Sequence, residues 1–193
     1  MKHVRRLVVA TANRDKITEI EALLDPGVEL LERPSSVGEV EEEAPDLIGN
    51  ARLKASAVSD ATGQPSLADD TGLFVAALGG KPGVRSSRFA GDAATYAENV
   101  SALLAAMDGR VDRRAEFRTV ALVRFPDGGE VWVQGVVRGE IVDRPRGAAG
   151  FGYDPLFAPD GGRGLTFAEM TLVEKNRCSH RSAAFGALAV LLR

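Results

Sequence analysis

Two adjacent carboxylates, Asp69 and Asp70, lie in an otherwise apolar stretch from Leu67 to Val75. Charged side chains at buried positions are costly unless they are paired, hydrogen-bonded or bound to a metal. Because successive side chains of a strand point to opposite faces, a strand here would direct the two acids to opposite sides. Asp-Asp-Thr-Gly is also good turn chemistry, so a solvated turn is the alternative to a metal or acid–base site.

A second chemically suggestive segment follows the apolar run Leu7–Ala10, which predicts a short buried strand. The polar turn after it contains Thr11, Asn13 and Lys16, and a helical pattern then runs to a stop at Asp25-Pro26-Gly27. A strand, a turn and a helix in this order point backbone N–H groups at an anion, which favours phosphate binding. Ordinary N-capping by Thr11 or Asn13 is the alternative, and the two interpretations are compatible.

The elements around these residues predict an α/β protein. A strand is expected over 28–31, and from Asp46 the pattern turns helical, with Asn50 and Lys54 on one face where both could address the same ligand. The acidic run from Glu39 to Glu43 is of a kind that is usually solvated. A further helix is expected over 93–107.

Two long strand patterns, 115–125 and 130–142, are joined by the turn Pro126-Asp127-Gly128-Gly129 and predict a hairpin. Neither strand alternates cleanly, which indicates that both faces are covered. The final helix is expected to begin after Ser179 as its N-cap, with His180 and Arg181 in its first turn. A cation there opposes the helix dipole unless an anion lies nearby, which is a small functional hint.

A glycine-rich segment, Gly147–Asp154, follows the second long strand. It does not predict a dinucleotide fold, because Pro155 and Pro159 forbid the helix that such a turn must feed. The glycines instead let the backbone approach a flat ligand, with Phe151 or Tyr153 stacking on it. An aromatic plug at the end of the sheet is the alternative.

Composition limits the function classes. The 193 residues predict a single domain over 1–193, or one domain with a subsidiary lobe, and a net charge of −3 offers no global attraction for nucleic acid. One cysteine, Cys178, and two histidines, His3 and His180, are too few for a Cys/His metal cluster. The apolar run after Lys2, Arg5 and Arg6 is too short for a signal peptide, and no apolar run spans a membrane, so we expect a cytoplasmic protein.

Taken together, the motifs resemble the inosine/xanthosine triphosphate pyrophosphatases over nearly the whole chain. The motifs occur along the chain in the same order as in that family, and the ordered set is far more specific than any one motif. They are 11–16 (TANRDK), Glu42, Asn50-Ala51 with Lys54-Ala55, 68–73 (ADDTGL), 80–91 (GKPGVRSSRFAG), 150–155 (GFGYDP), 167–170 (FAEM), 174–176 (EKN) and 179–181 (SHR).

The resemblance implies an α/β fold with a long mixed central sheet, flanking helices and an active-site cleft between two lobes. It also implies a homodimer that uses Mg²⁺ and binds a nucleoside triphosphate, but neither nucleic acid nor a membrane. Asp70 is expected to accept the proton of the attacking water and, with Glu42, to hold the metal. The residues expected to hold the triphosphate are Thr11, Ala12, Asn13, Arg14, Asp15, Lys16 and Lys54, and Thr71 is expected to contact the substrate. The residues expected to form the base pocket are Phe151, Gly152, Tyr153, Asp154, Lys175, His180 and Arg181.

Three positions depart from the family pattern. Gly49 stands where a glutamate is usual, Glu43-Ala44 replaces a small residue followed by glycine, and Arg85 stands where an aromatic is common. Because of these departures, the assignment of Glu42 as metal ligand, in preference to Glu41 or Glu43, stays open. The assignment of Asp70 is unaffected.

The expected activity is hydrolysis of non-standard purine nucleoside triphosphates (ITP, dITP and XTP) to the monophosphate and pyrophosphate. Such a reaction needs charge neutralisation along the phosphates and an in-line water, which suits a chain rich in acids and poor in histidine. One rival is a pyrophosphatase for pyrimidine or modified nucleotides. The other is a catalytically silent nucleotide- or RNA-binding protein, against which Asp70 and the net negative charge argue.

Overall fold

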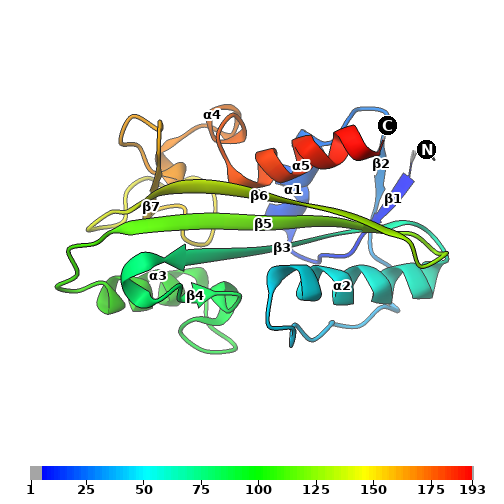
Figure 1. The fold of residues 1–193 in the computed structure, drawn as a ribbon, viewed down its shortest axis with the longest axis horizontal. Coiled ribbons are helices and arrows are strands. Elements are labelled where there is room, and N and C mark those ends of the chain that lie inside the picture. Colours follow the sequence, from blue (N-terminus) through cyan, green and yellow to red (C-terminus); the bar gives the residue numbers. More distant parts are fainter. Residues whose placement is uncertain (1–5, 193) are drawn as a thin grey trace. The chain divides into compact units, whose positions relative to one another are not determined.

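The computed structural model describes residues 6–192, and Lys2, His3 and Arg5 lie outside the described residues. The fold is α/β, as predicted, with a mixed sheet and helices (Figure 1). The strands are β1 (Arg6–Val9), β2 (Glu29–Leu31), β3 (Ser66–Val75), β4 (Pro82–Gly83), β5 (Arg114–Arg124), β6 (Glu130–Ile141) and β7 (Phe157–Pro159). The α-helices are α1 (Arg14–Leu23), α2 (Leu47–Thr62), α3 (Tyr96–Ala106), α4 (Leu172–Asn176) and α5 (His180–Leu191).

The strands hydrogen-bond in the order β2-β1-β3-β5-β6-β7, and β4 pairs with β3. Strand β1 runs parallel to both β2 and β3, with Leu7 opposite Leu30 and Val8 opposite Ser66. Strands β3 and β4, and likewise β6 and β7, are antiparallel. The sheet is therefore mixed.

The chain divides into two compact units, and neither is continuous in sequence. Unit 1 comprises the described residues up to Asp70, Thr119–Gly135 and the residues from Arg181, whereas unit 2 comprises Thr71–Arg118 and Val136–His180. By these ranges, β3, β5 and β6 each contribute residues to both units. The boundary in β3 falls directly after Asp70. The cleft that the family resemblance implies stays a prediction.

The core of unit 1 is built on one face of its strands. Leu7 of β1, Leu67 of β3 and Ala121 of β5 pack with Ile20 of α1 and with Phe185 of α5. Helix α2 covers the other face (Figure 1), where the Ser66 hydroxyl donates to the carbonyl of Ala55 at 2.6 Å. Because β3 alternates, Leu67 and Asp69 point toward α1 and α5, whereas Ser66, Ala68 and Asp70 point toward α2.

Unit 2 has its own core. Leu73 and Val75 of β3 pack with Leu103 of α3 and with Met107, the C-cap of that helix. The aromatic members of the same buried cluster are Phe117, Tyr153, Phe157 and Phe167. The strand β3 can pass close to β4 because residue 72 is glycine, since a Cβ there would lie 2.5 Å from the Gly83 carbonyl oxygen.

Asp69 and Asp70 lie within an unbroken ten-residue strand, so the turn interpretation of this segment is wrong and the strand interpretation is confirmed. The hairpin is also confirmed, with the Phe125 N–H donating to the Gly129 carbonyl at 2.8 Å. Helix α3 begins at Tyr96, three residues later than predicted, because Thr95 and Glu98 form a capping box that fixes its start.

The prediction that both faces of the second hairpin strand are covered is wrong for β6. Its even-numbered residues from Trp132 to Glu140 are exposed, and Trp132 itself is 45% exposed. The strand does not alternate cleanly because apolar residues stand on the exposed face as well. In the part of the chain that the structure describes, no helix is long and apolar enough to cross a membrane.

Candidate active site

Unit 1 contains a buried cluster of charged side chains that is built around the two acids of β3. Its cations are Lys16, Lys54 and Arg181, and its carboxylates are Glu19, Glu42, Asp69 and Asp70. Alternation along β3 divides this cluster into two sides, one facing α2 and the other facing α1 and α5.

Lys54 organises the side that faces α2. Its ammonium donates to Glu42 Oε1 at 2.7 Å, to Asp70 Oδ1 at 2.9 Å and to the backbone carbonyl of Asp69 at 2.7 Å. Asn50, one helical turn earlier on α2, donates from Nδ2 to Asp70 Oδ2 at 3.3 Å. The predicted common face of Asn50 and Lys54 is confirmed, and both side chains address Asp70.

Asp69 organises the opposite side. Its Oδ2 lies 3.2 Å from Lys16 Nζ of α1 and 3.3 Å from Arg181 Nη2 of α5. The other guanidinium nitrogen, Nη1 of Arg181, donates to Glu19 of α1. The cation in the first turn of α5 is therefore compensated by two carboxylates of the protein, which resolves the unfavourable position noted in the sequence.

The two neighbouring acids have pKa values shifted in opposite directions. Burial raises the pKa of Asp70, and the nearby charges of Lys54 and Lys16 offset this only in part. Burial also opposes ionisation of Asp69, but Lys16 and Arg181 outweigh it and hold the pKa of this carboxyl well below its usual range. The two adjacent acids therefore have different electrostatic environments, which favour the ionised form of Asp69 and the protonated form of Asp70.

The pKa values of the two lysines also depend on the balance between burial and neighbouring charges. Burial alone favours the neutral amine of Lys54, but Asp70 and Glu42 outweigh it and raise the pKa. At Lys16 burial dominates over the attraction of Asp69, so the pKa is lowered. Three cations against four carboxylates give the cluster a net charge of −1 when all are ionised. The cluster by itself therefore does not attract a triphosphate.

The N-terminal turn uses its polar groups locally. Asn13 is the N-cap of α1, and its side chain accepts from the N–H groups of Asp15 and Lys16 at 3.0 and 3.2 Å. Thr11 accepts from the Asn13 N–H at 3.1 Å, and Arg14 forms an exposed ion pair with Glu32 at 2.8 Å. The capping interpretation is confirmed. Within this segment, Lys16 is the residue whose side chain reaches the acids of β3, through its ion pair with Asp69.

Unit 2 contains a second group of predicted site residues, centred on a buried ion pair. Lys175 Nζ of α4 lies 2.6 Å from Asp154 Oδ2, and both side chains are 4% exposed. The same Asp154 oxygen accepts from the Phe151 N–H at 2.9 Å. The Lys175 ammonium lies 5.1 Å from the centre of the half-buried Phe151 ring, within the range of a cation–π contact.

Two other predicted base-pocket residues of unit 2, Tyr153 and His180, are buried. Tyr153 is 4% exposed, its hydroxyl donates to the Ser86 carbonyl at 2.9 Å, and burial raises its pKa. The imidazole of His180 stacks on Phe117 with centroids 4.6 Å apart. Gly152 has a φ of 61°, which favours glycine in this loop. Of the two aromatic candidates for stacking on a ligand, Tyr153 is buried in the core, as the alternative interpretation expects, whereas the ring of Phe151 is partly accessible.

Comparison with known proteins identifies the family of this chain. The sequence model of the Ham1 family matches residues 7–191. The chain belongs to the Ham1 family. A relative from Deinococcus radiodurans, named dITP/XTP pyrophosphatase, is 44% identical, and the match covers 97% of this chain and 92% of the relative. A relative of the same name from Thermus thermophilus is 45% identical over 95% of this chain and 89% of its own length.

Solved structures of Ham1 proteins have the same fold as this chain. A HAM1 protein from Coxiella burnetii has a TM-score of 0.89 and 38% identity, with 97% of this chain and 98% of that chain covered. The Staphylococcus aureus Ham1 protein has a TM-score of 0.87 and 34% identity, with 97% of each chain covered. The predicted resemblance and the α/β fold class are thereby confirmed.

Within this Ham1-family chain, the structure distinguishes Glu42 from its acidic neighbours. Glu41 and Glu43 are exposed, whereas Glu42 is half-buried and shares the Lys54 ammonium with Asp70. Two carboxylate oxygens thus converge on one cation position. Although the described residues contain no group of three or more His, Cys, Asp or Glu side chains suited to a metal, one or two carboxylates with phosphates and waters suffice for Mg²⁺. Glu42 and Asp70 could therefore hold it.

Two departures from the family pattern are linked by packing. A Cβ at residue 49 would lie 2.5 Å from the Cβ of Ala44 and 3.0 Å from Asp46 Oδ1. Alanine at 44 therefore requires glycine at 49, and the Ala44 N–H still donates to Asn50 Oδ1 at 2.9 Å. The third departure, Arg85, is exposed and lies 3.4 Å from Asp92.

Sequence reasoning did not include Glu19 and Asn50 among the site residues, and left the role of Asp69 open. For Asn50 the signal was its spacing of four residues from Lys54, which places both on one face of α2. Glu19 follows Lys16 by three positions in α1, so the two side chains are neighbours on the helix surface, yet nothing local distinguishes it from an exposed glutamate.

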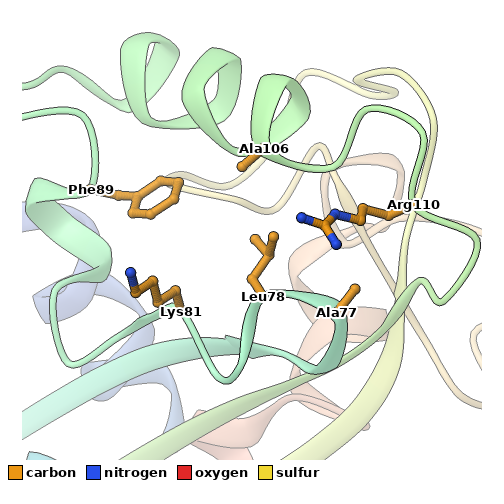
Figure 2. A pocket seen from close by; sticks show the side chains of 6 residues that line it. All are labelled: Ala77, Leu78, Lys81, Phe89, Ala106 and Arg110. Atoms are coloured by element: carbon orange, nitrogen blue, oxygen red, sulfur yellow. The ribbon is translucent and has the colours of Figure 1, made fainter.

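A pocket of about 430 Å³ in unit 2 lies apart from the predicted site residues. Figure 2 shows Phe89 and Leu78 facing the same space, with the charged ends of Lys81 and Arg110 at its margins. Its lining includes neither a carboxylate nor any predicted site residue. It therefore offers no proton acceptor or metal ligand for hydrolysis.

Proposed function

We propose that this protein hydrolyses ITP, dITP and XTP to the nucleoside monophosphate and pyrophosphate. The observation that carries the proposal is the buried Asp69–Asp70 pair, in which Asp69 is paired with Lys16 and Arg181 and Asp70 shares the Lys54 ammonium with Glu42. Membership of the Ham1 family and relatives named dITP/XTP pyrophosphatase support the substrate class.

We assign the triphosphate to the cluster of unit 1. Lys16 and Lys54 are the cations that address the phosphates, with the turn from Thr11 to Lys16 beside them along the chain. Asp70 accepts a proton from the water that attacks phosphorus, and Asn50 and Lys54 hold its carboxylate in place. Asp69 orients Lys16 and Arg181 through its ion pairs with both.

We further propose that Glu42 and Asp70 hold Mg²⁺, which supplies charge neutralisation along the phosphates when bound. The net charge of the cluster supports this assignment. With all seven groups ionised it stands at −1, and a triphosphate adds further negative charge. A divalent cation reverses the sign of the cluster and removes this repulsion.

The base is assigned to Phe151, Asp154 and Lys175 of unit 2, with Phe151 offering a ring for stacking. Lys175 carries only donors and ionised Asp154 only acceptors. A 6-oxo purine presents an acceptor at O6 and a donor at N1, whereas adenine reverses both. Guanine shares the 6-oxo edge, so GTP belongs in every substrate panel.

The bond that breaks provides the first test. We expect water to attack the α-phosphorus, because the described cluster contains two lysines to offset charge on a leaving pyrophosphate. A terminal phosphatase typically uses a P-loop or an arginine finger, and the sequence contains no P-loop motif. Hydrolysis of ITP in ¹⁸O-labelled water should place the label in IMP and none in pyrophosphate. Formation of IDP and free phosphate would contradict the assigned bond.

A substrate panel with Mg²⁺ and each nucleoside triphosphate tests the substrate class in the same assay. Preference for ITP, dITP and XTP supports the proposal. Preference for pyrimidine or modified nucleotides would favour the first rival, and binding without turnover would favour a silent nucleotide-binding protein.

Base selection by Lys175 is tested with Lys175→Gln. Loss of a charged hydrogen bond costs roughly 1.5–3 kcal/mol, so kcat/KM for ITP should fall about 10- to 150-fold and the loss for ATP should be smaller. The double variant Asp154→Asn/Lys175→Gln controls for the unpaired buried carboxylate that the single change leaves. An equal loss for ITP and ATP would reassign Lys175 to phosphate binding.

By the family resemblance we also propose a cytoplasmic homodimer that binds neither nucleic acid nor a membrane. Light scattering during size-exclusion chromatography measures the oligomeric state directly.

A further inference from the structure

An accessible aromatic side chain outside every predicted site position lies next to the proposed base-binding ring. Tyr96 of α3 is 42% exposed, and its ring centre lies 5.9 Å from that of Phe151 with an interplanar angle of 39°. We propose that Tyr96 is a positioning residue for the purine base, acting by holding the Phe151 ring. This inference rests on the proposed function.

The backbone of Tyr96 is fixed independently of Phe151. Tyr96 is the first residue of α3, and the preceding Thr95 forms a reciprocal capping box with Glu98. The Glu98 carboxylate accepts from the Thr95 N–H at 2.7 Å, and Thr95 Oγ1 accepts from the Glu98 N–H at 3.3 Å. The capping box fixes the backbone at the start of α3, from which the Tyr96 side chain extends.

Phe151 has a different set of supports. Its N–H donates to Asp154 Oδ2 at 2.9 Å, and the Lys175 ammonium lies 5.1 Å from its ring centre. These contacts fix the backbone of Phe151 and place a cation at its ring, and the flanking residues Gly150 and Gly152 have no side chains that could support the ring. The tilted contact with Tyr96 lies in the distance range at which aromatic pairs attract.

The location of Tyr96 predicts which kinetic constant it affects. Asp70 and the lysines that we assign to the phosphates belong to unit 1, whereas Tyr96 and Phe151 belong to unit 2. Loss of the Tyr96 ring should therefore weaken base binding and raise KM while leaving kcat unchanged, because base stacking contributes to binding and not to proton transfer.

A double-variant cycle tests the inference, with KM and kcat measured for ITP and Mg²⁺. Tyr96→Leu should raise KM about five- to tenfold, near the lower end for loss of a base-stacking aromatic. Tyr96→Phe, which keeps the ring, should resemble the wild type. When Phe151 has already been changed to leucine, Tyr96→Leu should alter KM by less than about twofold, because its effect passes through that ring.

Trp132→Leu is the matched control. Trp132 is a similarly exposed aromatic of β6, at 45%, and the structure describes no ring contact for it. It should leave KM and kcat unchanged, and thermal unfolding of every variant checks the fold. Equal effects of Tyr96→Leu with and without Phe151, or a fall in kcat alone, would overturn the inference while the proposed function stands. Failure of the wild type to hydrolyse any purine triphosphate would remove both.

Discussion

Asp70→Asn should lower kcat for ITP hydrolysis by about 10²- to 10⁴-fold, the range associated with losing a general base. The carboxyl is buried with a raised pKa, and an amide of the same shape cannot accept the proton of the attacking water. The fold should survive, because Lys54 keeps Glu42 and the Asp69 carbonyl as partners. Single-turnover kinetics measures the chemical step, and the affinity for a non-hydrolysable ITP analogue measures binding.

Glu42→Gln separates loss of the base from loss of a metal ligand. Since Glu42 shares the Lys54 position but is not assigned to proton transfer, its variant should recover activity as the Mg²⁺ concentration rises. Asp70→Asn should not recover. Near-wild-type kcat in the Asp70 variant would show that another group accepts the proton.

Asp69→Asn should instead destabilise the fold by about 3–5 kcal/mol, the usual cost of breaking a buried ion pair by removing one partner. The Asp69 side chain is fully buried between Lys16 and Arg181, and an amide leaves both cations without a compensating charge at this position. Its effect on the chemical step should be smaller than that of Asp70→Asn. Urea denaturation measures the free energy of unfolding.

Asp112→Asn supplies the matched control, because it removes a carboxylate of an exposed arginine pair in unit 2. Asp112 Oδ2 lies 2.7 Å from Arg114 Nη2, with the arginine side chain 78% exposed. Surface pairs contribute little, so this variant should unfold at nearly the wild-type urea concentration. Equal stability of the two variants would mean that Asp69 is not the anion that stabilises the cluster.

Local signals were sufficient to predict most elements of this fold. The cap at Asn13, the turn 126–129 and the alternation along β3 each depend on neighbours in the sequence, and all three were confirmed. Alternation alone separated Asp69 from Asp70, since the two faces of a strand are fixed by its backbone. The ordered motifs also predicted the family.

Only the tertiary structure decided which charges are paired. Arg181 meets Asp69 across 112 positions and Glu19 across 162, and no local pattern encodes such a contact. The choice of Glu42 among three consecutive glutamates likewise depended on where Lys54 of α2 places its ammonium. The opposite pKa shifts of the two acids follow from these partners, because residues of one type at adjacent positions acquire different chemistry from the charges and burial that the fold supplies.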